Sequence, residues 1–299
     1  MPRIVDRAIA GSVRLMPRGL VQRVSRRYIA GQTMGEALAV VARLANERCR
    51  ATVDVLGEHV TSREQCVATR DQYLNLLNRL QAERLPAGVS VKPTAMGLGL
   101  DRGFCLANLR DVARAAAAGG RFMRVDMEES TWTSATIDLI LELHAAHANV
   151  GAVVQARLRR SRGDVQALAE RQISVRLCKG IYHESPEIAL QDFSDIRGSY
   201  LEILDTLLSA GCYVGLATHD KGLVERALEM MKRHHVDQGR YEFQMLMGVA
   251  EPLRRRLVGE GHKMRVYVPY GSDWYGYSTR RLQENPQMAT AIALALLRP

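Results

Sequence analysis

Two adjacent arginines lie near the C-terminal end of the chain, in the motif YGYSTRRLQEN (residues 275–285). On a helix, neighbouring residues diverge by about 100°, so Arg280 and Arg281 do not lie on one flat solvated face. Two guanidinium groups at one place can hold a single anion from two directions. Because a chain with 41 lysines and arginines also carries solvated basic helices, other residues must decide whether this pair binds an anion.

Polar residues also stand at the ends of short β-branched runs. If these runs are parallel strands of a barrel, their carboxyl ends converge on one mouth, where the functional residues of such barrels lie. Taken singly, Lys92 can extend to solvent, Asp126 can cap a helix and His219 can be a structural histidine. Taken together, these residues predict a ligand site. The polar residues at the strand ends are Lys92, Asp126, Gln155, Arg176, Lys179, Thr218, His219, Gln244 and Tyr267.

The charges of these residues indicate which ligand the site would bind. The basic residues Lys92, Arg176 and Lys179 join the arginine pair, and we expect them to face only Asp126 and Glu284. Such a site suits a carboxylate substrate, a phosphorylated cofactor, or both. Barrel metal sites usually take several histidines or carboxylates from neighbouring strands, whereas Asp126 and His219 are several strands apart, so we expect no metal.

The elements that must position these residues alternate between strands and helices. Long amphipathic stretches separate the β-branched runs and are long enough for crossover helices. Runs that are apolar along most of their length favour a parallel sheet, so we predict the α/β class and a (β/α)₈ TIM-type barrel. A doubly wound sheet is the alternative, but GLGLDRG (97–103) does not match a phosphate-binding glycine turn. The expected strands are residues 52–57, 89–93, 122–127, 151–156, 173–179, 213–219, 241–246 and 265–270.

Length and composition fit one catalytic domain with an extension. We expect an N-terminal helical extension over residues 1–50 and the barrel over residues 51–299. The five cysteines are widely spaced without a CxxC pair, which favours a reducing compartment. We find no apolar run long enough to span a bilayer and no signal peptide pattern, so we expect a cytoplasmic protein.

The first 27 residues are rich in arginine, with Asp6 as their one acid. Apolar residues alternate with the arginines, so the segment could lie on an anionic membrane surface, act as a targeting peptide, or simply pack on the barrel. A net charge of +9 and a pI near 9.6 also suit nucleic acid, but the chain has no recognition motif for it and we expect none.

Several motifs together resemble the proline dehydrogenase family, from about residue 50 to residue 285. The matching segments are RVDME (124–128), VVQARLRRS (153–161), RLCKGIYHE (176–184), LATHD (216–220), EFQMLMG (242–248) and YVPYG…WYGYSTRRLQEN (267–285). The resemblance implies a flavin-dependent (β/α)₈ barrel that oxidises L-proline to 1-pyrroline-5-carboxylate. It further implies bound FAD and electron transfer to a membrane quinone, with peripheral contact on the inner face of the membrane.

The resemblance also implies roles for single residues. It makes Arg280 and Arg281 the clamp for the substrate carboxylate, helped by Lys92. It gives Asp126 the task of orienting Lys92 and a substrate tyrosine, and it places Arg176 at the hydride-accepting nitrogen of the flavin. The implied walls of the substrate ring are Tyr267, Tyr277 and Leu246. The implied cofactor contacts, besides Arg176, are Met127, Gln155, Lys179, Gly180, Ile181, Thr218, His219 and Glu284.

Two residues depart from the family pattern. Ile181 stands where many relatives have alanine, and His183 stands where some have a tryptophan. Three other functions stay open: a related flavin barrel for hydroxyproline or another cyclic amino acid, a Schiff-base aldolase using Lys92 or Lys179, and a non-enzymatic basic scaffold.

Overall fold

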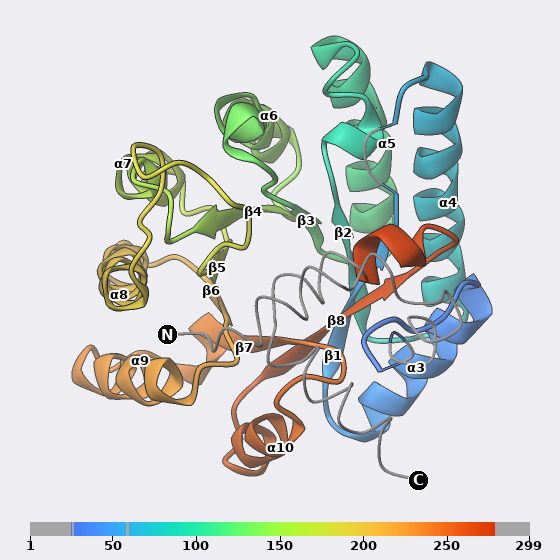
Figure 1. The fold of residues 1–299 in the computed structure, drawn as a ribbon. Helices are drawn as coiled ribbons and strands as arrows, with labels where there is room; N and C mark the ends of the chain where they lie inside the picture. The colour runs from blue at the N-terminus through green and yellow to red at the C-terminus, as the bar shows by residue number, and fades with distance from the viewer. Residues whose placement is uncertain (1–24, 26, 58–59, 279–299) are drawn as a thin grey trace, which may run out of the picture.

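The protein folds as a closed barrel of eight parallel strands. The computed structural model describes residues 25, 27–57 and 60–278. Each strand pairs in parallel with its sequence neighbours, and β1 closes the barrel against β8 (Figure 1). The predicted α/β barrel is therefore confirmed. The strands are β1 (Arg50–Val55), β2 (Ala87–Val91), β3 (Met123–Val125), β4 (Val150–Gln155), β5 (Val175–Cys178), β6 (Val214–Ala217), β7 (Tyr241–Leu246) and β8 (Met264–Tyr270).

Helices surround the barrel on its outside, as Figure 1 shows. Several begin at a residue whose side-chain oxygen accepts a backbone N–H of the first turn; Asp101 does this for Phe104, and Asp220 does it for Leu223. In these helices, the cap residue marks the end of the loop that precedes the helix. The helices are α3 (Met34–Asn46), α4 (Arg63–Ala82), α5 (Arg102–Ala118), α6 (Thr133–Ala146), α7 (Ser161–Glu170), α8 (Phe193–Ser209), α9 (Lys221–Arg233) and α10 (Glu251–Gly259).

The strands present an apolar face to the helices and a polar face to the inside of the barrel. On β7, Phe243 and Met245 belong to the hydrophobic core, whereas Glu242 and Gln244 alternate with them and are also buried. Successive strand residues point to opposite faces, so this alternation separates an apolar outer layer from a hydrogen-bonded interior. Many barrels of this type fill their interior with branched apolar side chains instead.

Helix α3 covers the junction between the first and the last strand. Its residues Ala37, Leu38, Val41 and Leu44 are buried in the same hydrophobic core as the strands. A capping box between Thr33 and Glu36 sets the start of this helix. The division at residue 50 stays a prediction, but the described end of the extension shares the core of the barrel.

The strand bounds differ from the sequence expectation by a few residues, mainly because regular pairing stops before the chain leaves the sheet. Strand β3 ends at Val125, yet the Asp126 N–H still donates to the carbonyl of Val91 at 2.9 Å. In the described part of the chain, no helix is long and apolar enough to cross a membrane.

Candidate functional site

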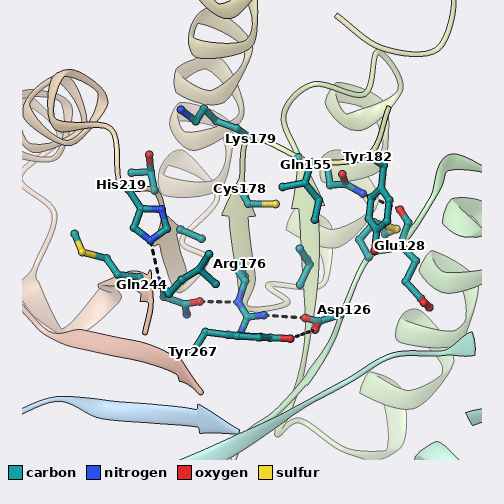
Figure 2. Close-up of a pocket in the computed structure, with 18 of the residues that line it drawn as sticks. Asp126, Glu128, Gln155, Arg176, Cys178, Lys179, Tyr182, His219, Gln244 and Tyr267 are labelled. Carbon is teal, nitrogen blue, oxygen red and sulfur yellow. Dashed lines mark hydrogen bonds and ion pairs between the residues drawn. The ribbon is translucent and has the colours of Figure 1, made fainter. Parts of the chain in front are cut away.

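A cavity of about 590 Å³ opens at the carboxyl ends of the strands. Its size is typical of a site for a small molecule or cofactor. Figure 2 shows side chains from many strands converging on it. Of the residues proposed from the sequence, those lining it are Lys92, Asp126, Met127, Gln155, Arg176, Lys179, Gly180, Ile181, Thr218, His219, Gln244, Leu246, Tyr267 and Tyr277. The remaining three, Arg280, Arg281 and Glu284, lie outside the described residues.

Arg176 lies at the floor of the cavity and is held from two sides. Its Nη1 donates to Asp126 Oδ1 at 2.8 Å and to Ser90 Oγ at 3.0 Å. Its Nε donates to Gln244 Oε1 at 2.6 Å (Figure 2). The guanidinium carbon also lies 5.3 Å from the centre of the Tyr267 ring, within the range of a cation–π contact. The result is a buried cation with a fixed orientation.

Asp126 collects several hydrogen bonds at the same place. Besides Arg176, it accepts Ser90 Oγ at 2.7 Å and Tyr267 Oη at 3.1 Å. Burial, together with the nearby carboxylates of Asp126 and Asp54, raises the pKa of Tyr267 well above its usual value. Tyr267 is therefore a neutral phenol that donates to Asp126 at physiological pH. This direct contact supports the proposal that Asp126 orients Tyr267.

Lys92 is held by an aspartate that the sequence reasoning missed. Its Nζ lies 2.7 Å from Asp54 Oδ2, and Asp54 is completely buried. Tyr73 Oη lies 3.2 Å from Asp54 Oδ1 and 2.6 Å from the carbonyl of Ser90. Burial raises the pKa of Asp54, and the Lys92 ammonium opposes that rise. A signal for Asp54 was present in the sequence, because an acid interrupts an otherwise apolar strand, TVDV.

Lys179 lies at the rim of the cavity and also has an acidic neighbour. Its Nζ is 3.3 Å from Asp220 Oδ2, which accepts Arg197 Nε at 2.7 Å as well. Burial opposes the charged form of Asp220, but Arg197, Lys179 and the Leu223 N–H outweigh it and lower its pKa. Asp220 thus joins the rim of the cavity to the start of α9.

The described cations of the site are each paired with a carboxylate. Lys92 pairs with Asp54, Arg176 with Asp126, and Lys179 with Asp220. The expectation that the cations face only Asp126 and Glu284 was therefore wrong. The reason is positional, because Asp54 lies inside its strand and Asp220 lies in a helix cap, whereas the sequence reasoning counted only strand ends.

His219 ties two neighbouring strand ends together. Its Nε2 accepts the backbone N–H of Leu246 at 2.9 Å, which links the loop after β6 to the end of β7 (Figure 2). An accepting Nε2 means that a neutral His219 carries its proton on Nδ1. The histidine fixes the backbone of Leu246, one of the expected walls of the substrate site.

One wall of the cavity has a buried acceptor that could hold a bound ring. Gln155 Nε2 donates to the carbonyl of Glu128 at 2.8 Å, while its Oε1 has no hydrogen-bond partner among the described residues. A side chain at Gly180 would place its Cβ 2.8 Å from that oxygen, and Gly180 has a positive φ of 94°. The glycine keeps the space next to the acceptor open. These residues fit a planar group that donates an N–H.

Other lining residues were missing from the proposed set. Tyr182 lines the cavity beside Ile181. Glu128 also lines the cavity and accepts the backbone N–H of Thr94 at 3.0 Å. Ile181 is 39% exposed at the rim. A tyrosine in a loop and an acid just after Asp126 lack a distinctive spacing, so only the fold places them at the site. Among the described residues, no group of acids, histidines and cysteines is arranged to hold a metal ion.

Comparisons with known proteins give a consistent result. The family model described as proline dehydrogenase matches residues 37–293. The chain is 32% identical to proline dehydrogenase of Deinococcus radiodurans, covering 92% of this chain and 90% of the relative. It is also 32% identical to proline dehydrogenase 2 of Bacillus subtilis, covering 93% and 92% of the two chains.

A solved structure shares the barrel. Proline utilization A from Bdellovibrio bacteriovorus, inactivated by N-propargylglycine, superposes with a TM-score of 0.84 at 26% identity. The match covers 89% of this chain and 33% of that longer protein. Since the family model spans most of the chain and relatives above 30% identity are covered almost completely, this chain belongs to the proline dehydrogenase family.

Proposed function

We propose that the protein is an oxidoreductase that oxidises L-proline to 1-pyrroline-5-carboxylate. The observation that carries the proposal is the fixed Arg176 cation at the floor of a cavity that also holds Lys92 and Gln155 Oε1, which has no partner among the described residues. In a member of this family, such a cavity has to take both a small amino acid and a redox cofactor. The matched relatives are named for the dehydrogenation of proline.

FAD is the cofactor that we assign to this cavity, and when bound it supplies the ring that accepts a hydride from the substrate. Gln155 would accept a ring N–H through Oε1. The fixed charge of Arg176 would stabilise the negative charge that arises on reduction. Following the resemblance, the residues that would surround the ribityl chain and the phosphates include Lys179, Gly180, Thr218 and His219.

The substrate would be held by charge at one end and by apolar contact at the other. Lys92, fixed by Asp54, would bind the carboxylate together with Arg280 and Arg281. Since the described cations already have acidic partners, the arginine pair would supply most of the net positive charge. Tyr267, Tyr277 and Leu246 would enclose the ring. Positioning is the main task of these residues, because the chemistry of the step belongs to the cofactor.

The geometry around Lys92 disfavours the aldolase alternative. A Schiff-base lysine must be neutral to attack a carbonyl, and enzymes achieve this by desolvation or by a neighbouring cation. Lys92 instead lies 2.7 Å from a buried carboxylate, which favours its charged form. Lys179 also has a carboxylate neighbour, since its Nζ lies 3.3 Å from Asp220 Oδ2.

Electrons would leave the reduced enzyme for a membrane quinone. The arginine-rich N-terminus would then lie on the anionic inner face of the membrane and keep the enzyme close to this acceptor.

The proposal is tested by purifying the protein and recording its absorbance. We expect a yellow protein whose visible flavin bands bleach when L-proline is added under anaerobic conditions. Adding a soluble quinone should restore the bands, and trans-4-hydroxy-L-proline tests the choice of substrate. A colourless protein that does not bleach added FAD with any imino acid would overturn the proposal.

A further inference from the structure

Behind Arg176, away from Asp126, a second chain of hydrogen bonds runs into the barrel. Gln244 Oε1 accepts Arg176 Nε at 2.6 Å, and Gln244 Nε2 donates to Glu242 Oε1 at 2.7 Å. Figure 2 shows the amide of Gln244 beside the guanidinium. Gln244 and Glu242 are two residues apart on β7, so both point into the barrel. Their side chains therefore connect the cavity floor to the interior below it.

Chemistry fixes which way the Gln244 amide points. An arginine has only donors, and an ionised carboxylate has only acceptors. The amide oxygen must therefore face Arg176 and the amide nitrogen must face Glu242. A flipped amide would lose both hydrogen bonds at once and leave buried polar groups unpaired, which is costly.

Glu242 is itself immobilised. It is 1% exposed, and Arg265 donates to it through Nε at 2.5 Å and Nη2 at 3.1 Å. Arg265 Nη1 also donates to the carbonyl of Ala51 at 3.0 Å, which ties the pair to β1. Burial opposes the charge of Glu242, but Arg265 and Gln244 outweigh burial and lower its pKa. Glu242 is therefore a rigid acceptor for Gln244.

A glycine on the neighbouring strand makes room for this arrangement. Gly215 on β6 pairs in register with Glu242 on β7. A Cβ added at Gly215 would lie 2.3 Å from Gln244 Nε2 and 2.8 Å from Gln244 Cδ. Any side chain at this position would therefore displace the amide. The space and both hydrogen bonds all favour a single position of Gln244.

We propose that Gln244 and Glu242 are positioning residues that orient the Arg176 guanidinium toward the flavin, with Gly215 giving Gln244 its place. This inference rests on the proposed function. Asp126 and Ser90 hold one side of Arg176, and Gln244 holds the other. The third nitrogen, Nη2, makes no hydrogen bond within the described part of the chain, and it is the group left to meet a ligand. Without Gln244 the guanidinium can turn about its remaining contacts, and its charge no longer lies at one place.

Two variants test in different ways whether Gln244 orients Arg176. Gln244→Met removes both hydrogen bonds at nearly constant volume, and Gly215→Ala keeps Gln244 but displaces it. Gly198→Ala on α8 is the matched control, because a Cβ there meets no atom of the described residues within 4 Å. The readouts are kcat and KM for L-proline, the flavin reduction potential, and the ¹⁵N–¹H resonance of Arg176 Nε, assigned with Arg176→Lys.

For both test variants we expect kcat to fall about tenfold while KM stays within about twofold, the pattern of a contact that acts in the transition state. The reduced flavin should lose about tenfold in relative stability, which lowers a two-electron potential by about 30 mV. The Arg176 Nε–H resonance should shift and exchange faster with solvent. Gly198→Ala should match the wild type in every readout.

The inference is overturned if both variants bind flavin, are bleached by proline and keep the wild-type potential, kcat and Arg176 resonance. Should Gln244→Met fail to fold, Gly215→Ala alone decides, because the added Cβ meets the far end of the Gln244 side chain rather than backbone. A wild-type protein that binds no flavin would contradict the proposed function instead. The Arg176 resonance of that protein would still show whether Gln244 holds the guanidinium.

Discussion

At the scale of single residues, the site depends on buried partners more than on the side chains that reach the cavity. Lys92 can be held in place because Asp54 lies 2.7 Å away with no exposed surface. Asp54 contacts a second strand through Tyr73, which bonds the carbonyl of Ser90. Lys92, which is proposed to bind the substrate, therefore depends on the Asp54 carboxylate for its position.

Asp54→Asn should weaken substrate binding without emptying the site of flavin. The amide keeps the shape of the side chain but removes the charge that holds Lys92, and a hydrogen bond to a charged group is worth about 1.5–3 kcal/mol. We expect KM for L-proline to rise about tenfold or more, measured by steady-state kinetics. Asp71→Asn, the same change on the exposed face of α4, is the control and should leave KM unaltered. An unchanged KM in Asp54→Asn would show that Lys92 does not need this partner.

Arg281→Met tests the arginine pair itself. If Arg281 helps to hold the substrate carboxylate, its loss should raise KM for L-proline at least tenfold, equivalent to about 1.4 kcal/mol. The flavin spectrum should stay the same, because this residue is assigned to substrate rather than to cofactor. A KM equal to that of the wild type would mean that the clamp is misassigned.

Sequence reasoning found the residues at the strand ends but missed two of their acidic partners, Asp54 and Asp220. Lys92, Asp126 and Arg176 could be predicted, because one rule places the carboxyl ends of barrel strands at a common mouth. The acid inside the run TVDV marked Asp54 as unusual, but its pairing with Lys92 could not be predicted, because that pairing depends on which strands adjoin and how they are staggered. The pairing of β1 with β2 places Asp54 beside Ser90, two residues before Lys92, and local spacing in the sequence does not predict this register.

At the scale of elements, alternating periodicities were sufficient to predict a barrel. Eight apolar runs separated by amphipathic stretches correspond to the eight observed strands. The same reasoning divided the chain at residue 50, because α3 precedes the first strand and its sequence has the pattern of an ordinary amphipathic helix. Its position over the junction of β1 and β8 comes from tertiary packing, which periodicity does not encode.

Leu38→Ala tests whether α3 is part of the barrel core. Leu38 is buried in the same cluster as the strands, so we expect the substitution to cost about 2–5 kcal/mol of unfolding free energy. Arg43→Ala on the exposed face of α3 is the control and should change stability by less than about 0.5 kcal/mol. Urea unfolding followed by circular dichroism measures both. A small loss for Leu38→Ala, or a separate early transition, would instead support an independent extension.

The start of α9 should show a pH-dependent contribution from Asp220. Its pKa is lowered in the folded protein by Arg197, Lys179 and the helix N-terminus, acting against burial. The stability that its charge contributes is therefore fully present above the ordinary pKa of 3.8 and is lost as the pH falls through the folded value. Asp220→Asn keeps a good cap but removes the charge. In urea unfolding, we expect the unfolding free energy of this variant to be clearly lower than that of the wild type at pH 7, and the difference to shrink by pH 3. A difference that stays the same at both pH values would show that the Asp220 charge does not contribute this stability.

At the scale of the whole molecule, the barrel combines an apolar outer layer with a charged interior. Arg124, Glu242 and Arg265 are all inside it and are matched by carbonyls or by each other. Burial is the main reason that the pKa of Arg124 falls to about 9. Such an interior contributes little hydrophobic stabilisation, but its hydrogen bonds and ion pairs permit one arrangement of the side chains under the cavity. The fold thus supports a rigid site at its mouth.

The whole protein is proposed to contact a membrane through its arginine-rich N-terminal segment. Ile29 packs with Leu56 and Tyr277 on the barrel, so a cut that removes residues 1–24 leaves this contact intact. The removed segment contains Arg3, Arg7, Arg14, Arg18 and Arg23, and each basic residue near an anionic surface is worth about 1 kcal/mol.

We therefore expect the truncated protein to partition onto anionic vesicles at least tenfold more weakly than the full chain in a sedimentation assay. The difference should vanish on neutral vesicles and in high salt, because screening removes charge attraction but not apolar insertion. Activity with a soluble electron acceptor should be equal in the two proteins, which separates membrane contact from damage to the site. Equal partitioning onto anionic vesicles would mean that these arginines have another role, and the proposed route to membrane quinone would then need a different docking surface.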